Sequence, residues 1–144
     1  MMTFAYPAKF ERDESGRYAV SFPDFARAHT DGSDMAEAMC EAADCLGSAI
    51  AFLMADKSEV PKPSAPKRGQ RLVPVPLWIA AKLALYWAVR EGGVTQTELA
   101  RRLGVRETVV RRMLDPHHAS RAEGLHAALA ALGKRVVMAW EDAA

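Results

Sequence analysis

Arginines cluster between residues 96 and 113, where the chain reads Gln-Thr-Glu-Leu-Ala-Arg-Arg-Leu-Gly-Val-Arg-Glu-Thr-Val-Val-Arg-Arg-Met. A guanidinium group can bond guanine O6 and N7 together, or it can bind a phosphate. The stretch predicts two short helices joined by a tight turn, because Gly104 can adopt the positive φ that such a turn needs. The small residue Ala100 lies where the two helices must approach closely. The spacing is typical of a helix-turn-helix that reads DNA.

Local signals place further helices around this motif. Thr95 and Glu98 form a capping box, which predicts a helix start at residue 96. The apolar run 76–91 predicts a preceding helix that is buried on most faces, so that Trp78, Leu85 and Trp87 are core or dimer contacts. Ser120 and Glu123 repeat the capping-box pattern and predict one more helix, which ends at Gly133. The sequence therefore predicts a compact bundle of four helices.

From about Pro76 onward this pattern resembles the lambda-repressor-like helix-turn-helix domains. The resemblance implies that the side chain of Gln96 contacts a phosphate and that the helix after Gly104 faces the major groove. On that helix we expect Arg106, Thr108 and Arg111 to contact bases. The predicted DNA-contacting residues are Gln96, Arg101, Arg102, Arg106, Glu107, Thr108, Arg111 and Arg112. The alternative is a helical bundle whose basic face is merely solvated and binds no nucleic acid.

Composition divides the chain near residue 60. Residues 60–70 contain three prolines, a serine and a glycine, which favours a linker, and the charges differ on its two sides. Residues 1–59 carry 5 Lys+Arg and 11 Asp+Glu, net −6, whereas residues 60–144 carry 14 and 7, net +7. We therefore predict two domains, residues 1–75, which include the Pro-rich loop 60–70, and residues 76–144. The acidic half favours a basic protein partner, and the alternative is an ordinary solvated acidic surface.

The first half predicts a β-β-β-α-β order and so an α+β fold. A hairpin loop, residues 13–16, ends in the glycine that its turn needs. A long helix from Asp34 to about Ala55 has its apolar residues on one stripe, and Ser33 offers the capping oxygen. We expect strands at residues 6–12, 17–22, 26–30 and 70–75.

Segments of this half resemble the HicB antitoxin family, whose fold is usually described as partly RNase H-like. The residues that carry the resemblance are 6–13, 16–25, 30–32 and 36–49, and the resemblance extends over most of residues 3–75. It implies a type II toxin–antitoxin role, in which this domain covers the active site of a small, basic, HicA-like toxin that cleaves mRNA.

The segment Phe22-Pro-Asp-Phe25 places a charge and an aromatic ring at a rigid turn. We predict Asp24 and Phe25 as toxin contacts. The alternative is a packing turn, with Phe22 and Phe25 in the core.

The sequence offers little for catalysis or metal binding. A residual nuclease would need carboxylates that converge on two metal ions, and Glu11, Asp13 and Glu14 lie together at a hairpin tip instead. Cys40 and Cys45 point about 140° apart on one helix, which disfavours a disulfide. We expect no enzyme activity, no cofactor and no metal.

The sequence also lacks the patterns that would direct the protein to secretion or to a membrane. The N-terminus lacks the pattern of a signal peptide, and two cysteines without secretion features suit a reducing cytoplasm. The run from Leu77 to Val89 is too short to span a membrane and is broken by Lys82. We therefore expect a cytoplasmic protein.

Residues 134–140 predict a β-strand with no partner in a helical domain. Pairing with a second copy about a two-fold axis would remove the exposed edge, so we expect at least a homodimer. The predicted dimer contacts are Val136, Val137, Met138 and Trp140.

Taken together, the patterns predict an antitoxin that neutralises a HicA-like mRNA interferase and represses its own operon through operator DNA. One alternative is a stand-alone helix-turn-helix repressor whose first domain senses a ligand or dimerises. The other is a weak RNase H-like nuclease.

Overall fold

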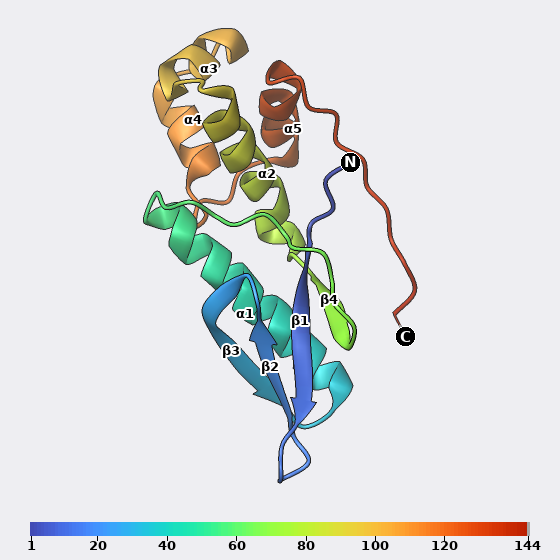
Figure 1. The fold of residues 1–144 in the computed structure, drawn as a ribbon. Coiled ribbons are helices and arrows are strands. Elements are labelled where there is room, and N and C mark those ends of the chain that lie inside the picture. The colour runs from blue at the N-terminus through green and yellow to red at the C-terminus, as the bar shows by residue number, and fades with distance from the viewer. Residues whose placement is uncertain (144) are drawn as a thin grey trace. The chain divides into compact units, whose positions relative to one another are not determined.

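The computed structural model describes residues 1–143 and forms two compact units, Met1–Ala80 and Ala81–Ala144 (Figure 1). The first unit contains a β-sheet and a long helix, and the second contains helices only. The predicted α+β class is therefore confirmed.

The first unit is an antiparallel sheet with one helix across a face (Figure 1). Its strands are β1 (Ala5–Arg12), β2 (Tyr18–Phe22), β3 (Phe25–Gly32) and β4 (Gln70–Pro74), and their order in the sheet is β3-β2-β1-β4. The helix α1 (Met35–Ala55) follows β3. Alternate strand residues such as Tyr6, Val20 and Val73 are at most 2% exposed, and Leu46 and Ile50 of α1 are fully buried. These residues make one core, as the alternating and helical periods predict.

Caps and turns account for how the hairpin and helix begin. Gly16 has φ +84°, and Asp13 Oδ1 accepts hydrogen bonds from the backbone N–H groups of Ser15 (2.9 Å) and Arg17 (3.0 Å). The N-cap of α1 is Asp34, which accepts from the Glu37 N–H at 2.8 Å, so the prediction that Ser33 caps the helix is wrong. Ser33 instead donates its backbone N–H to Glu37 Oε2 at 2.8 Å. The side chains of Asp34 and Glu37 thus accept the N–H groups at the start of the helix, and the cap lies one position later than expected.

Among the described residues, helix α1 is the segment long and apolar enough to be considered as a membrane span, and the run Leu77–Val89, which was considered from the sequence, is not. By length and composition alone α1 could cross a membrane. Its buried residues, among them Ala38, Ala42 and Leu46, belong to the core of the first unit. Burial against a sheet accounts for the composition of such a helix without a lipid phase.

The Pro-rich loop 60–69 belongs to the first unit and is not a free linker. Val60 is 2% exposed, and Tyr6 Oη donates to the Pro61 carbonyl at 2.6 Å. Because the loop adds basic residues to that unit, the charge contrast is smaller than the sequence division suggested. Residues 1–80 carry 9 Lys+Arg and 11 Asp+Glu, net −2, and residues 81–144 carry 10 and 7, net +3.

The second unit contains α3 (Gln96–Leu103), α4 (Glu107–Leu114), α5 (Ala122–Ala131) and most of α2 (Leu77–Gly92). The four predicted helices are thus present. Leu85, Leu99, Val110 and Leu129 form a common core that is at most 3% exposed. Trp87 is 6% exposed, whereas Trp78 is 54% exposed and lies beside Gly47 in the first unit.

The predicted C-terminal strand is not formed. Within the described residues, 134–143 contain no helix or strand, although the Lys134 N–H still donates to the Leu129 carbonyl at 2.9 Å. A strand needs a neighbour for its backbone groups, and this single chain offers none to the segment. We call residues 134–143 the C-terminal tail.

Candidate nucleic-acid interface and partner-binding turn

The turn between α3 and α4 has the geometry that its sequence predicts. Thr95 caps α3 by accepting from the Glu98 N–H at 3.0 Å. Gly104 ends the helix with φ +66°, and the Val105 N–H donates to the Ala100 carbonyl at 3.0 Å. Ala100 is 4% exposed and lies in the helical core. The small residue and the glycine therefore stand where close packing and a left-handed backbone require them.

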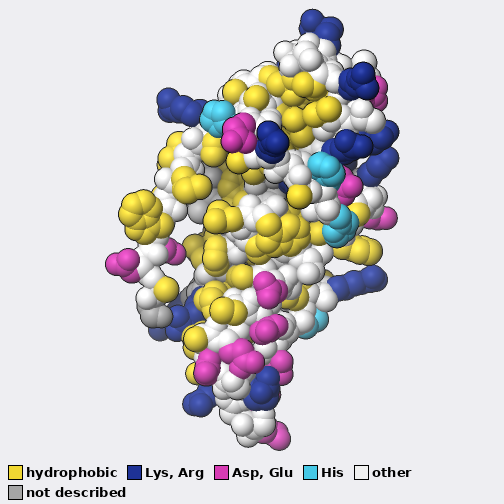
Figure 2. Space-filling view, turned by 180° about the vertical axis from the view of Figure 1, so that it is seen from behind, with side chains coloured by type: hydrophobic (Ala, Val, Ile, Leu, Met, Phe, Trp, Pro, Cys, Tyr) yellow, Lys and Arg dark blue, Asp and Glu magenta, His cyan; other side chains and the backbone are white. Residues whose placement is uncertain are grey.

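Helix α4 has one buried face and one exposed face. Val110 and Met113 are 0% and 8% exposed and join the core of the second unit. The exposed residues of this region are Arg106, Glu107, Thr108, Val109, Arg111 and Arg112. On the face shown in Figure 2, Lys and Arg side chains gather over the part of the surface formed by the second unit.

The guanidinium groups of Arg106, Arg111 and Arg112 have no hydrogen-bond or ion-pair partner among residues 1–143. Arg106 is also the N-cap of α4, where its side chain makes no capping bond. Three cations are thus held near one short helix with their donors open to solvent. This arrangement can bind the phosphates or base edges of a polyanion.

Arg101 and Arg102 have a different environment from the arginines of α4. Glu98 Oε2 and Oε1 accept from Arg101 Nε (2.8 Å) and Nη2 (2.7 Å), and Oε1 also accepts from Arg102 Nε at 3.0 Å. These bonds, first from Arg101 and then from Arg102, lower the pKa of Glu98 to about 2. The carboxylate therefore does not return to the Thr95 N–H, and the reciprocal half of the predicted capping box is missing.

Of the three remaining predicted contacts, Thr108 is exposed on α4, and Gln96 and Glu107 are the first residues of α3 and α4. Gln96 is half-buried. Glu107 is exposed, and its Oε2 accepts from Thr97 Oγ1 at 3.0 Å, a bond that ties the start of α4 to the start of α3. Glu107 is thereby held at the helix start, where a carboxylate is favourable.

Lys82 is buried, although the sequence suggested no role for it beyond a break in an apolar run. It is 3% exposed, and its Nζ donates to the Arg112 carbonyl (2.9 Å), the Met113 carbonyl (3.1 Å) and Ser120 Oγ (2.9 Å). Burial lowers the pKa of Lys82, and the nearby charge of Asp115 opposes that shift. The available signal was a lone lysine inside a helix that is apolar on most faces, since buried lysines require partners.

The second predicted capping box, which Ser120 and Glu123 were expected to form, is not present. Ser120 accepts from Lys82, and the N-cap of α5 is Arg121, which makes no side-chain capping bond. Ser120 thus precedes the N-cap by one residue, and the lysine that binds its hydroxyl lies 38 positions earlier in the chain.

The turn after β2 uses its side chains inside the first unit. Phe25 is 6% exposed and meets Tyr6 edge-on with ring centroids 4.9 Å apart, while Phe22 is 3% exposed. Asp24 Oδ2 accepts from both Ser64 N and Ser64 Oγ at 3.0 Å. Phe25 is therefore a core residue with little exposed surface, which favours the packing-turn alternative, and its contact with a toxin stays a prediction. Asp24 is half-buried and stays a predicted contact.

The carboxylates proposed for a residual nuclease serve local structure. Glu11 pairs with Lys9 at 2.8 Å, and Asp13 binds the backbone of its own hairpin loop. These bonds lower the pKa of Asp13, with the Ser15 hydroxyl as the largest cause. Within residues 1–143 no group of three His, Cys, Asp or Glu residues could hold a metal ion.

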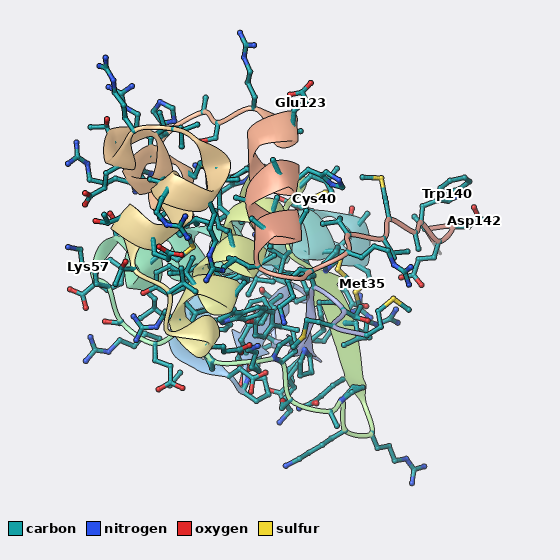
Figure 3. All side chains as sticks on the ribbon, turned by 90° about the horizontal axis from the view of Figure 1, so that it is seen from above. Met35, Cys40, Lys57, Glu123, Trp140 and Asp142 are labelled. Atoms are coloured by element: carbon teal, nitrogen blue, oxygen red, sulfur yellow. The ribbon has the colours of Figure 1, made fainter. Side chains whose placement is uncertain are left out.

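The C-terminal tail exposes its apolar side chains. Val136, Val137, Met138 and Trp140 are 51%, 63%, 79% and 92% exposed. Figure 3 shows Trp140 and Asp142 on the extended chain that leads away from α5. The residues predicted as dimer contacts are therefore exposed in the single chain, and their contact with a second copy stays a prediction.

Comparisons with known proteins cover most of the chain, and they all match it to the same kind of protein. Residues 5–84 match the family described as HicB_like antitoxin of bacterial toxin–antitoxin systems. The protein named Antitoxin HicB 2 of Photorhabdus laumondii subsp. laumondii is 40% identical over 131 residues, which cover 91% of this chain and 92% of the relative. Antitoxin HicB of Escherichia coli K12 is 37% identical over 131 residues, 91% of this chain and 95% of the relative. Antitoxin HicB of Pseudomonas fluorescens is 32% identical over 132 residues, 91% of this chain and 90% of the relative.

Proposed function

The chain belongs to the HicB-like family of antitoxins of bacterial toxin–antitoxin systems, and from this premise we propose that it neutralises a HicA-like mRNA-cleaving toxin and represses its own operon. The proposal divides the two tasks between the units. Residues 1–80 bind the toxin, and residues 81–144 bind operator DNA. Neither task requires a catalytic step by this chain.

The observation that carries the DNA-binding part is the set of open guanidinium groups at α4. Arg106, Arg111 and Arg112 surround a helix that Val110 and Met113 anchor in the core. Burial of one face decides which side of the helix is exposed, so the backbone that carries the arginines needs little further ordering when they bind. A recognition helix places its first residues nearest the base edges, which supports Arg106 and Thr108 as readers of sequence.

A gel-shift titration with the chain's own promoter region tests this part. Arg106→Ala together with Arg111→Ala should weaken specific binding by about 100-fold or more, since each bidentate contact to guanine contributes about 1–3 kcal/mol. Arg27→Ala, which removes an exposed arginine of β3, is the matched control and should leave binding unchanged. Wild-type affinity in the double variant would contradict a reading role for α4.

Family membership carries the toxin-binding part, and charge supports it only modestly. The net charge of −2 on residues 1–80 is small, although Asp34, Glu37, Glu41 and Asp44 bring acidic groups to the first half of α1 and its cap. Acidic groups of this kind favour a basic partner and speed its encounter. Asp24 is the specific contact that we propose.

Co-expression with the protein encoded beside this chain tests the toxin-binding part. We expect a stable stoichiometric complex with a small basic protein that arrests growth when it is expressed alone. A chain that binds its operator but captures no such protein would instead be a stand-alone repressor.

We also propose that the chain acts as a dimer, held by Val136, Val137, Met138 and Trp140 of the C-terminal tail. Two copies would bind two operator half-sites, and their tails could pair as strands that a single chain leaves unformed. Removal of residues 134–144 should reduce the mass in sedimentation equilibrium to that of a monomer. An unchanged dimer after truncation would exclude the tail as the interface.

A further inference from the structure

The Lys82 ammonium group binds the end of α4 and the following loop through three hydrogen bonds, none of which has been assigned a part in the two proposed tasks. Its three ammonium donors match three acceptors at 2.9–3.1 Å: the carbonyl groups of Arg112 and Met113 and the hydroxyl of Ser120. The group is 3% exposed, so it reaches no phosphate and no solvent ion. A buried charge with full hydrogen bonding is costly to leave unmatched, so its acceptors are strongly specified.

The acceptors belong to the last turn of α4 and to the loop that follows it. Helix ends leave their final carbonyl groups without intrahelical partners, and these groups carry the negative end of the helix dipole. The Lys82 ammonium meets two of them, and Asp115 just beyond the helix adds a further negative charge near the lysine. The helix α4 has only eight residues, and side-chain capping at its N-terminus is absent. The lysine is therefore its main polar attachment at the C-terminal end.

The same ammonium also holds the loop after α4. Ser120 lies just before α5, and its Oγ is 3.4 Å from the Arg112 carbonyl that Lys82 binds. Within the loop, the His118 N–H donates to the Asp115 carbonyl at 3.2 Å. One buried cation thus connects α2, the end of α4 and the approach to α5.

We propose that Lys82 is a positioning residue for the DNA-reading helix: it fixes the C-terminal end of α4 and the following loop on α2, and so sets the angle at which the arginines of α4 are presented. The inference rests on the proposed DNA-binding function. Lys82 contributes to affinity without touching the nucleic acid. Apolar packing of Val110 and Met113 decides which face of the helix is buried but leaves its exact angle less strictly defined, because such contacts have little directionality. Three directional hydrogen bonds at one end fix that angle.

Lys82→Met in the full chain tests the proposal, because methionine keeps much of the length of the side chain and removes the donors. We expect specific operator affinity to fall about tenfold or more, since hydrogen bonds to charged groups are among the stronger ones. The dependence of affinity on salt should keep its slope, whereas loss of a phosphate-contacting lysine would reduce the slope by about 0.9. Lys82→Arg, which retains the charge and donors, should recover part of the affinity.

Hydrogen exchange supplies a readout that does not depend on DNA. The Asp115 amide, which donates to the Arg112 carbonyl at 3.2 Å, should exchange faster in Lys82→Met, while the Leu99 amide of α3 should keep its rate. Should Lys82→Met fail to fold, Ser120→Ala removes one of the three acceptors of Lys82, together with the hydroxyl's contacts to the Arg112 carbonyl and to His118, and should weaken binding about threefold.

Three results would overturn the inference: wild-type affinity in folded Lys82→Met, a reduced salt slope in that variant, or wild-type affinity in Ser120→Ala where Lys82→Met does not fold. A wild-type chain that binds no promoter fragment would overturn the proposed DNA-binding function itself. That result is distinct, because it appears before any substitution is made.

Discussion

Two of the regions predicted to contact other molecules, the arginine face of α4 and the turn Phe22–Phe25, have side chains in opposite environments. In α4 the apolar residues Val110 and Met113 turn inward and the arginines stay outside. In the turn, the Phe25 ring packs edge-on against Tyr6, and the Asp24 carboxylate accepts a hydrogen bond from Ser64, although both residues were predicted as contacts with another molecule. A helix separates its faces by period, so exposure follows from spacing, whereas a turn has no period from which exposure could be inferred.

Phe25→Ala should have the largest effect on this comparison. Because the ring is buried against Tyr6, its loss should lower the free energy of unfolding by about 3–5 kcal/mol in a denaturant titration. Phe52→Ala, whose ring is 70% exposed on α1, should change stability by less than about 0.5 kcal/mol. Normal stability of Phe25→Ala combined with lost toxin binding would support Phe25 as a contact residue.

Asp24→Asn should have an intermediate effect and separates the two roles of that carboxylate. The substitution weakens the charge-assisted bonds from Ser64 and should cost about 1–2 kcal/mol of stability. Ser64→Ala removes the hydroxyl half of the same connection and is the matched control for structure alone. If Asp24 also contacts the toxin, isothermal titration should show weaker toxin binding in Asp24→Asn but not in Ser64→Ala. Equal toxin affinity in both variants would leave Asp24 with a structural role only.

Glu98→Gln should have the smallest effect and tests the contrast between held and open arginines. Release of Arg101 and Arg102 should raise non-specific DNA affinity, and the salt dependence of that affinity should steepen by up to about 0.9 for each additional phosphate that an arginine binds. A lower non-specific affinity would indicate that Glu98 orders these arginines for binding instead of occupying them.

The acid stability of the wild-type chain and Glu98→Gln should also differ. The pKa of Glu98 in the folded chain is about 2, against 4.5 for the free side chain. The stabilisation from its ionised form is therefore complete above about pH 4.5 and is lost as the pH falls toward about 2. In Glu98→Gln this part of the pH dependence should be missing from thermal melts that cover the same pH range. Identical acid profiles would show that the Arg101 and Arg102 bonds add no stability.

Much of the fold could be predicted because its signals are local. Thr95 and Gly104 bound α3 through contacts with residues no more than five positions away, and Gly16 closes its hairpin in the same way. Strand alternation and the apolar stripe of α1 likewise need only neighbouring residues. The arginine face of α4 belongs to this class, since Val110 and Met113 indicate which side of the helix is buried.

Several incorrect predictions concern competition between alternative hydrogen-bond partners. Ser120 was predicted as a cap, but it lies one residue before the N-cap Arg121, and a buried lysine 38 residues earlier binds its hydroxyl. Glu98 has the right position for a capping box, but two guanidinium groups are stronger donors than one backbone amide. The loop 60–69 has the composition of a linker, but Tyr6 and Asp24 bind it to the first unit.

By itself the sequence determined where the helices and the four strands of the sheet lie and which face of α4 carries open cations, because period, capping and the φ of glycine act over a few residues. Only the tertiary structure decided that Lys82 holds the end of α4, that Phe25 is a core residue and that the Pro-rich loop lowers the charge contrast between the units. The Lys82 and loop outcomes depend on which of several polar groups comes within about 3 Å of a given donor, and chain segments 30 or more residues apart set that distance. The burial of Phe25 depends instead on its packing against Tyr6 of another strand. Within the described residues the C-terminal tail forms no strand, because a strand needs a neighbour for its backbone groups.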